Sequence, residues 1–149
     1  MRLRKYFKRL GSRKGRKRRT SITPHYQTYR PVAQKIISHK VQCWANHIGV
    51  TYNRVTIRNQ RSRWGSCSSQ KNLNFNYRLI FLPEYLLDYV VVHELCHLYE
   101  LNHSAEFWSL VEHIYPQYKD AMKDLKCFEK NKATNLCYLE QYSAIIGSQ

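Results

Sequence analysis

Apolar residues recur with helical spacing from about residue 31 to residue 48. Their positions are Val32, Ile36, Ile37, Val41, Trp44, Ala45 and Ile48. They lie on one face of a helix, because residues three and four apart share a side. Pro31 suits a first helical position, and Gly49 suits the position just after a helix. The stretch therefore predicts an amphipathic helix over residues 31–48.

A two-residue period follows, which is typical of β-strands. Val55 and Ile57 alternate with polar residues, and residues 68–71 read as a turn. The longest alternation places apolar side chains at Leu73, Phe75, Tyr77, Leu79 and Phe81. We expect a small three-stranded antiparallel sheet, with one face on the core and a polar face, Asn72 to Arg78, outside.

The C-terminal half predicts helices. Pro83 suits a helix start, and residues 85–101 are apolar on nearly every side, so this helix is expected to be central and buried. Ser104 suits the N-cap of the next helix, and a last, more polar helix follows Pro116. The elements together predict an α+β fold, in which the sheet packs on the first helix and on the buried helix.

The H-E-x-x-H motif formed by His93, Glu94 and His97 lies in the buried helix. His93 and His97 are one turn apart on one face, where two neutral imidazoles can bind a zinc ion. Glu94 is rotated by about 100° from that line, close enough to reach a water on the metal. His103 is the natural third ligand if the helix ends before it, and we expect Asn102 to stop the helix in a left-handed conformation. Three protein ligands leave a fourth position for water, as a catalytic site requires.

The alternative to a metal site is a buried helix whose histidines are satisfied core groups. Outside the motif, His39 and His47 are expected to be surface or core residues rather than ligands. Cys96 lies within the motif, and we expect it to be a small buried core residue.

The 149 residues suit one domain around one core. The net charge of +15 is unevenly distributed: residues 1–83 hold 20 of the 25 Lys and Arg, and all ten acidic residues lie at or after Glu84. Residues 1–23 form a basic tail, for which we expect disorder and either nucleic-acid contact or the role of a solvated arm. We expect the folded domain to span residues 24–130, followed by a C-terminal tail at 131–149.

The cysteines predict no disulfide framework, because five are present without a C-x-x-C pair. An odd number of cysteines without an apolar secretion signal fits a reducing compartment, so we expect a cytoplasmic protein. No apolar run reaches the length of a membrane span, so we expect no membrane partner. The sequence leaves the oligomeric state open.

The stretch from about Val55 to Tyr118 resembles the YgjP-like zinc metallopeptidases, relatives of the SprT and WLM groups. The motifs that match are Arg63-Trp64-Gly65-Ser66-Cys67, Asn72 to Pro83, Asp88 to His97, Asn102-His103-Ser104 and Phe107-Trp108. The resemblance implies that His93, His97 and His103 bind zinc and that Glu94 is the catalytic base. It also implies a minimal zincin-like domain, composed of a helix, a short sheet, the metal helix and its successor.

Two features depart from related patterns. Proteins of this family usually carry a larger strand-rich segment before the first helix, where this chain has a basic tail. The spacing of the three histidines equals that of metzincins, but Glu100 replaces the glycine at which the metzincin chain turns, and no later Met-turn is evident. We therefore do not assign the chain to the metzincins.

These observations predict a zinc-dependent metallohydrolase, above all a metallopeptidase that acts on peptide or protein substrates. Zinc would activate a water and polarise the scissile carbonyl, and Glu94 would move the proton to the leaving amine. Arg63, His113 and Tyr115 are candidates for stabilising the oxyanion, and the sequence does not choose among them.

Two other functions stay open at this stage. A metal-dependent nucleoside triphosphate pyrophosphohydrolase is one, since relatives have been linked to that activity, although the chain has no Walker-type loop and no evident carboxylate cluster for magnesium. A nucleic-acid-associated module with structural zinc is the other; it would need a fourth ligand, such as His113 or Cys96. A peptidase held on DNA by its tail, as in the SprT relatives, combines the two ideas.

Overall fold

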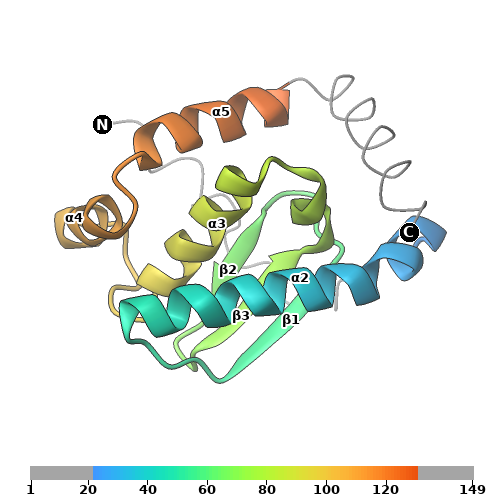
Figure 1. Ribbon diagram of the computed structural model, residues 1–149, viewed down its shortest axis with the longest axis horizontal. Coiled ribbons are helices and arrows are strands. Elements are labelled where there is room, and N and C mark those ends of the chain that lie inside the picture. Colours follow the sequence, from blue (N-terminus) through green and yellow to red (C-terminus); the bar gives the residue numbers. More distant parts are fainter. Residues whose placement is uncertain (1–21, 131–149) are drawn as a thin grey trace, which may run out of the picture.

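The computed structural model describes residues 22–130, which fold into four α-helices, one 3-10 helix and a three-stranded sheet (Figure 1). In chain order the elements are α2 (Pro24–Ile48), β1 (Arg54–Arg58), β2 (Gly65–Cys67), β3 (Asn72–Asn76), the 3-10 helix η1 (Tyr77–Phe81), α3 (Glu84–Cys96), α4 (Ala105–Ile114) and α5 (Tyr118–Lys130). This combination of helices and a small sheet confirms the predicted α+β class. The two predicted tails, 1–23 and 131–149, lie outside the described residues except for residues 22 and 23.

Helix α2 begins at Pro24, earlier than the apolar pattern predicts, and Pro31 lies inside it. The Thr23 side chain caps the helix by accepting a hydrogen bond from the backbone N–H of Tyr26 at 3.2 Å. The Tyr26 hydroxyl donates to the carbonyl of Ile57 in β1 at 2.8 Å, which ties the first turns to the sheet. We attribute the longer helix to this cap and this contact, which outweigh the cost of an internal proline. The predicted end is confirmed, because the residue after Ile48 is a glycine with a left-handed φ of 78°.

The sheet is mixed, so the prediction of a wholly antiparallel sheet is wrong. Its order is β1-β3-β2, with β3 parallel to β1 and antiparallel to β2. A tight turn joins β2 to β3, in which the Lys71 N–H donates to the Ser68 carbonyl at 2.9 Å. This hairpin occupies one edge of β3, so β1 pairs with the other edge and the connection 59–64 carries the chain across. Alternation predicts that strands form, but it does not say which strands are neighbours.

Strand β3 ends at Asn76, and Tyr77–Phe81 form a 3-10 helix instead of the continued strand that the alternation predicts. The Asn76 side chain accepts a hydrogen bond from the backbone N–H of Arg78 at 3.2 Å, which starts the turn. Ile80 is 8% exposed, although a continued strand would direct it to the outer face. Side chains at both odd and even positions are buried here, which explains why a helical turn replaces the predicted strand.

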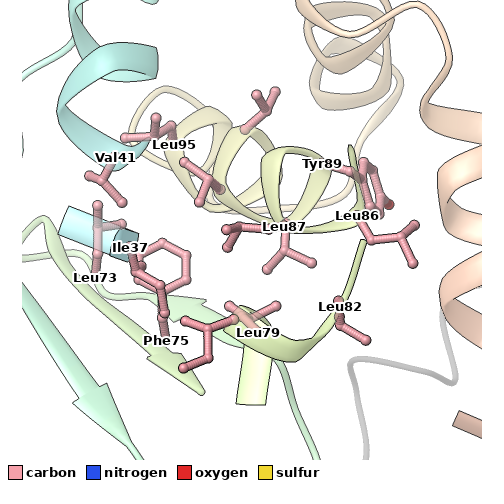
Figure 2. Close-up of a cluster of buried hydrophobic side chains, with 14 of the residues drawn as sticks. Ile37, Val41, Leu73, Phe75, Leu79, Leu82, Leu86, Leu87, Tyr89 and Leu95 are labelled. Atoms are coloured by element: carbon pink, nitrogen blue, oxygen red, sulfur yellow. The ribbon is translucent and has the colours of Figure 1, made fainter. Parts of the chain in front are cut away.

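Helix α3 is the centre of the core, as its apolar sequence predicts. Ten of its 13 residues are buried. Figure 2 shows the leucines of α3 lying among side chains of α2, β3 and η1, including Ile37, Val41 and Phe75. The helix therefore carries any polar residue of its sequence into a largely apolar interior.

A polar cluster ties α2 to α3. The indole Nε1 of Trp44 donates to the Asp88 carboxylate at 2.9 Å, and the Lys40 ammonium lies 3.1 Å from the same carboxylate. Lys40 also pairs with Glu84 in the first turn of α3. This cluster links the N-terminal half of α3 to α2, while the C-terminal half leads to the histidines.

The buried Asn76 organises the connection before β2. Its amide nitrogen donates to the carbonyls of Gln60 at 2.7 Å and Arg63 at 3.2 Å. With the bond from Arg78, the side chain makes three hydrogen bonds while only 4% exposed. Asn76 is therefore a main anchor of the connection that leads to Gly65.

We predict that Asn76→Ala lowers the free energy of unfolding by about 1–3 kcal/mol, because buried carbonyls and an N–H lose their partner. Urea unfolding followed by tryptophan fluorescence measures this loss. Asn74→Ala is the matched control; its amide faces outward and bonds only at 3.4 Å, to Ser66 and Arg58. Equal losses in the two variants would contradict the assigned role of Asn76.

Candidate metal centre

Three histidines meet at the C-terminal end of α3. The ring centroids of His93 and His97, one helical turn apart, are separated by 4.9 Å. His103 returns after the helix to within 5.1 Å and 4.6 Å of these two centroids. One ring nitrogen of each residue lies within 4.8 Å of the others, and the Nε2 atoms of His93 and His103 are 3.1 Å apart. The structure thus brings together the three histidines that the sequence singles out.

Helix α3 ends earlier than expected, and it ends without the expected left-handed residue. It stops at Cys96, and His97 follows with a right-handed backbone. The N–H groups of Tyr99 and Glu100 both donate to the Cys96 carbonyl at 3.1 Å, which satisfies the helix end without a left-handed residue. Asn102 is not among the described residues with positive φ, so the predicted left-handed stop at Asn102 is wrong.

The ring of His97 is oriented by the turn that follows it. Its Nδ1 lies 2.9 Å from the backbone carbonyl of Glu100. Because a carbonyl only accepts, the imidazole donates from Nδ1, and its Nε2 carries the lone pair. A partner of this kind is common behind metal-binding histidines, where it sets the tautomer and the ring plane.

Burial keeps the three imidazoles neutral. Loss of hydration is the largest effect on each: it lowers the pKa of His93 well below 6.5, lowers the pKa of His97, and lowers the pKa of His103 to about 4. The neighbouring imidazoles lower the pKa of His93 and His103 further, whereas the Glu100 carbonyl partly opposes the effect at His97. Neutral imidazole is the form that binds metal ions, so the cluster is prepared for one at neutral pH.

Aromatic side chains from α4 support the histidine cluster. The Phe107 ring stacks on His97 with centroids 4.4 Å apart, and the Trp108 ring stacks on His103 at 5.6 Å. Trp108 is itself stacked on Tyr118 of α5 at 5.6 Å. No role at the site was predicted for Trp108 or Tyr118 from the sequence. The available signal was the position of two aromatic residues just after the third histidine.

Glu94 lies beside the cluster, packed against strand β2. Its side chain is buried, and a Cβ added at Gly65 would lie 2.7 Å from both its Cγ and its Oε1. Only glycine therefore leaves room for the carboxyl at this point. Burial raises the pKa of Glu94 to about 8, and the positive charge of Arg63 opposes that rise. Glu94 was predicted from the sequence, but the requirement for glycine at position 65 was not.

The donor set fits a zinc-sized cation. In a tetrahedral site with Zn–N bonds of about 2.0–2.1 Å, two ligand nitrogens are separated by roughly 3.3 Å. The 3.1 Å between the Nε2 atoms of His93 and His103 is close to that value. Within residues 22–130, no further His, Cys, Asp or Glu joins the group. Three ligands leave room for water or substrate, as in catalytic rather than closed structural sites.

The comparison with protein families agrees with this geometry. A family model described as YgjP-like, metallopeptidase domain, matches residues 4–128. The chain belongs to the YgjP-like metallopeptidase family. It is therefore a metallopeptidase, and its family implies a divalent metal ion, for which the three histidines form a suitable group.

Two solved structures share the fold of this YgjP-like protein. One is the metallopeptidase zymogen abylysin of Pyrococcus abyssi, with a TM-score of 0.56 and 22% identity over 64% of this chain and 95% of the other. The other is the metallopeptidase zymogen jannalysin of Methanocaldococcus jannaschii, with a TM-score of 0.53 and 22% identity over 63% and 95%. A search of curated proteins found no match. These likenesses support the expected zincin-like architecture.

Three other histidines and Cys96 lie outside the metal group. His39 and His47 are exposed on α2, and His113 is exposed on α4. Cys96 is fully buried in the core, which confirms the interpretation of this residue as a packing residue. Neither Cys96 nor His113 therefore supplies a fourth ligand to the three histidines.

The three oxyanion candidates differ in their surroundings. The Tyr115 hydroxyl donates to the Tyr85 carbonyl at 2.9 Å, so its proton is already engaged. His113 is exposed and outside the histidine group. Arg63 is the candidate whose charge acts on Glu94. The assignment of an oxyanion residue stays a prediction, with Arg63 the one favoured by its surroundings.

We predict that Gly65→Ala lowers the free energy of unfolding by about 1–3 kcal/mol, because the added methyl group overpacks the Glu94 side chain. Peptide hydrolysis should fall roughly 10²-fold, the cost of a displacement of about 1 Å at a reacting group. Metal content should not change. Ser66→Ala, the next residue in β2, is the control and should stay close to wild type. Wild-type stability and turnover in Gly65→Ala would disprove the contact.

Proposed function

We propose that this YgjP-like metallopeptidase hydrolyses peptide bonds with a zinc ion held by His93, His97 and His103 and with Glu94 as the general base. The observation that carries the proposal is the gathering of three ring nitrogens within 4.8 Å, next to a buried carboxyl. When bound, zinc supplies a Lewis acid that polarises the scissile carbonyl and acidifies water. Imidazole ligands suit zinc, and the open three-ligand set suits catalysis.

Glu94 performs the proton transfers in this proposal. It takes a proton from the attacking water and delivers that proton to the leaving amine. Burial raises the pKa of Glu94, and a bound cation would lower it again towards the ionised form that a general base needs. Contact with Gly65 holds the carboxyl in place, while the Glu100 carbonyl and the Phe107 ring hold His97.

Strand β2 offers a place for an extended substrate. It is the terminal strand of the sheet, and its first residue, Gly65, contacts Glu94. An extended peptide can add to the edge of a sheet through main-chain hydrogen bonds, while its side chains enter flanking sites. Such a peptide would bring its backbone alongside the general base.

The other expectations receive less support. No carboxylate cluster suited to magnesium occurs among residues 22–130, which disfavours the pyrophosphohydrolase. A purely structural zinc site lacks its fourth ligand there. In the same part of the chain, no helix has the length and apolar character needed to cross a membrane. Nucleic-acid binding by the tail, the domain boundaries and the cytoplasmic location stay predictions.

Loss of a residue that only hydrogen-bonds to a metal ligand costs ~10–100-fold in metal affinity. We predict that His97→Ala reduces zinc affinity by more than this, because it removes a ligand itself. His93→Ala and His103→Ala should behave in the same way. Competition against a chromophoric chelator measures the affinity. His113→Ala, an exposed histidine, serves as the control and should bind zinc normally. Normal zinc retention by His97→Ala would rule out the proposed ligand set.

We predict that Glu94→Gln retains zinc but hydrolyses peptides about 10²–10⁴-fold more slowly, the usual contribution of a general base. Zinc content by mass spectrometry and turnover of a panel of peptides and denatured proteins provide the test. Glu112→Gln, an exposed carboxylate on α4, is the matched control. If Glu94→Gln loses zinc, Glu94 is a ligand; if it keeps full turnover, another group is the base.

A further inference from the structure

The face of the sheet that points away from the core is polar. Ile57, Leu73 and Phe75 enter the core, where α2 and α3 pack (Figure 1). Alternation along each strand sends the neighbouring side chains to the opposite face. That face carries Arg54, Thr56 and Arg58 from β1, Ser66 from β2, and Asn72 and Asn74 from β3.

Positive charge gathers on this face and around its rim. The residues, called the basic face from here on, are Arg54, Arg58, Arg61 and Lys71. All four are exposed. No acidic residue precedes Glu84 in the chain, and none of the four forms an ion pair with an acidic side chain of the described residues. The charge of the basic face is therefore not neutralised within the folded domain.

The charges lie at both ends of a strand. Arg54 and Arg58 are four residues apart on one face of β1, which separates them by about 13 Å at ~3.3 Å per residue. Lys71 lies at the Arg54 end, because its carbonyl accepts a hydrogen bond from the Asn53 N–H at 2.9 Å. Arg61 follows the Arg58 end in the connection to β2. A linear polyanion lying along β1 would therefore meet cations at both ends of the strand.

Short polar side chains occupy the strip between the charges. The Asn74 amide donates to the Ser66 hydroxyl and accepts from Arg58 Nε, both at 3.4 Å. The Asn72 side chain accepts from Asn53 at 3.0 Å. Side chains of this size let a ligand backbone approach the sheet closely, and amides and hydroxyls commonly contact phosphate and sugar oxygens.

We propose that the basic face binds the phosphate backbone of nucleic acid, separately from the basic tail. Cations without acidic partners favour a polyphosphate, because binding releases its condensed counterions. Three of the four residues are arginines, whose planar guanidinium groups match phosphate with paired hydrogen bonds. The outer strand positions carry no aromatic side chain on which bases could stack, so the contacts are to phosphate and sugar, and recognition is independent of base sequence. Regularly repeating phosphates fit these spaced arginines better than the irregular carboxylates of an acidic peptide.

The test compares two double variants of the full-length protein. Arg54→Gln with Arg58→Gln removes two charges from the basic face. Arg30→Gln with Lys35→Gln removes two exposed charges from α2, on the other side of the sheet. Fluorescence anisotropy with a labelled 20-nucleotide oligothymidylate measures binding over a range of salt concentrations. Zinc content and thermal unfolding should match wild type for both variants.

The basic-face variant should bind the oligonucleotide at least about tenfold more weakly at low salt, and its salt slope should fall by about 1.4, since each phosphate contact on a single strand contributes roughly 0.7. The α2 variant should stay near wild type. If the basic-face variant unfolds, Arg61→Gln with Lys71→Gln, outside the strands, repeats the test. Equal affinity and slope in the two double variants would overturn the proposal.

A labelled polyglutamate peptide of similar length separates nucleic acid from acidic polypeptide. The proposal expects it to bind much more weakly than the oligonucleotide, with little change in the basic-face variant. An equal loss of affinity for both probes would reject nucleic acid as the specific partner and assign the face to acidic polypeptides.

Discussion

Burial of α3 is the constraint on which the rest of the structure depends. The helix is apolar on nearly all sides, yet it carries His93, Glu94 and His97 into the interior with exposed fractions of 3%, 3% and 8%. Loss of hydration disfavours charge on each of them, which lowers the pKa of the imidazoles and raises that of the carboxyl. The same burial that is unfavourable for polar groups thus produces neutral ligands and a carboxyl suited to proton transfer.

Several neighbouring elements then add restraints at this centre. Strand β2 presents Gly65 to the carboxyl, and the turn after α3 presents a carbonyl to His97. Helix α4 contributes the stacked rings, and α5 supports them through Tyr118. At the other end of α5, the Glu129 carboxylate accepts a hydrogen bond at 2.9 Å from the indole of Trp64. Trp64 is the residue before Gly65. The same contacts therefore pack the domain and set the geometry of its metal centre.

The sequence by itself determined the features that depend on local periodicity and local chemistry. The apolar spacing predicted α2, the buried α3 and the class of the fold, and Ser104 was recognised as the cap of α4. The spacing of His93 and His97 places two imidazoles on one helical face whatever surrounds the helix. The proposed base and two of the proposed ligands could be named for this reason, whereas His103 was named on the expectation that the helix ends before it.

Tertiary structure decided what depends on contacts between distant residues. The bond from Tyr26 to Ile57 accompanies a longer α2, and the β2–β3 hairpin makes β1 pair in parallel. Capping by Asn76 ends β3 where alternation predicts more strand. The close approach of Glu94 to Gly65 joins positions 29 residues apart, and no local pattern marks it. Periodicity describes which face of an element is apolar, whereas packing between elements chooses the partner of that face and the point at which each element ends.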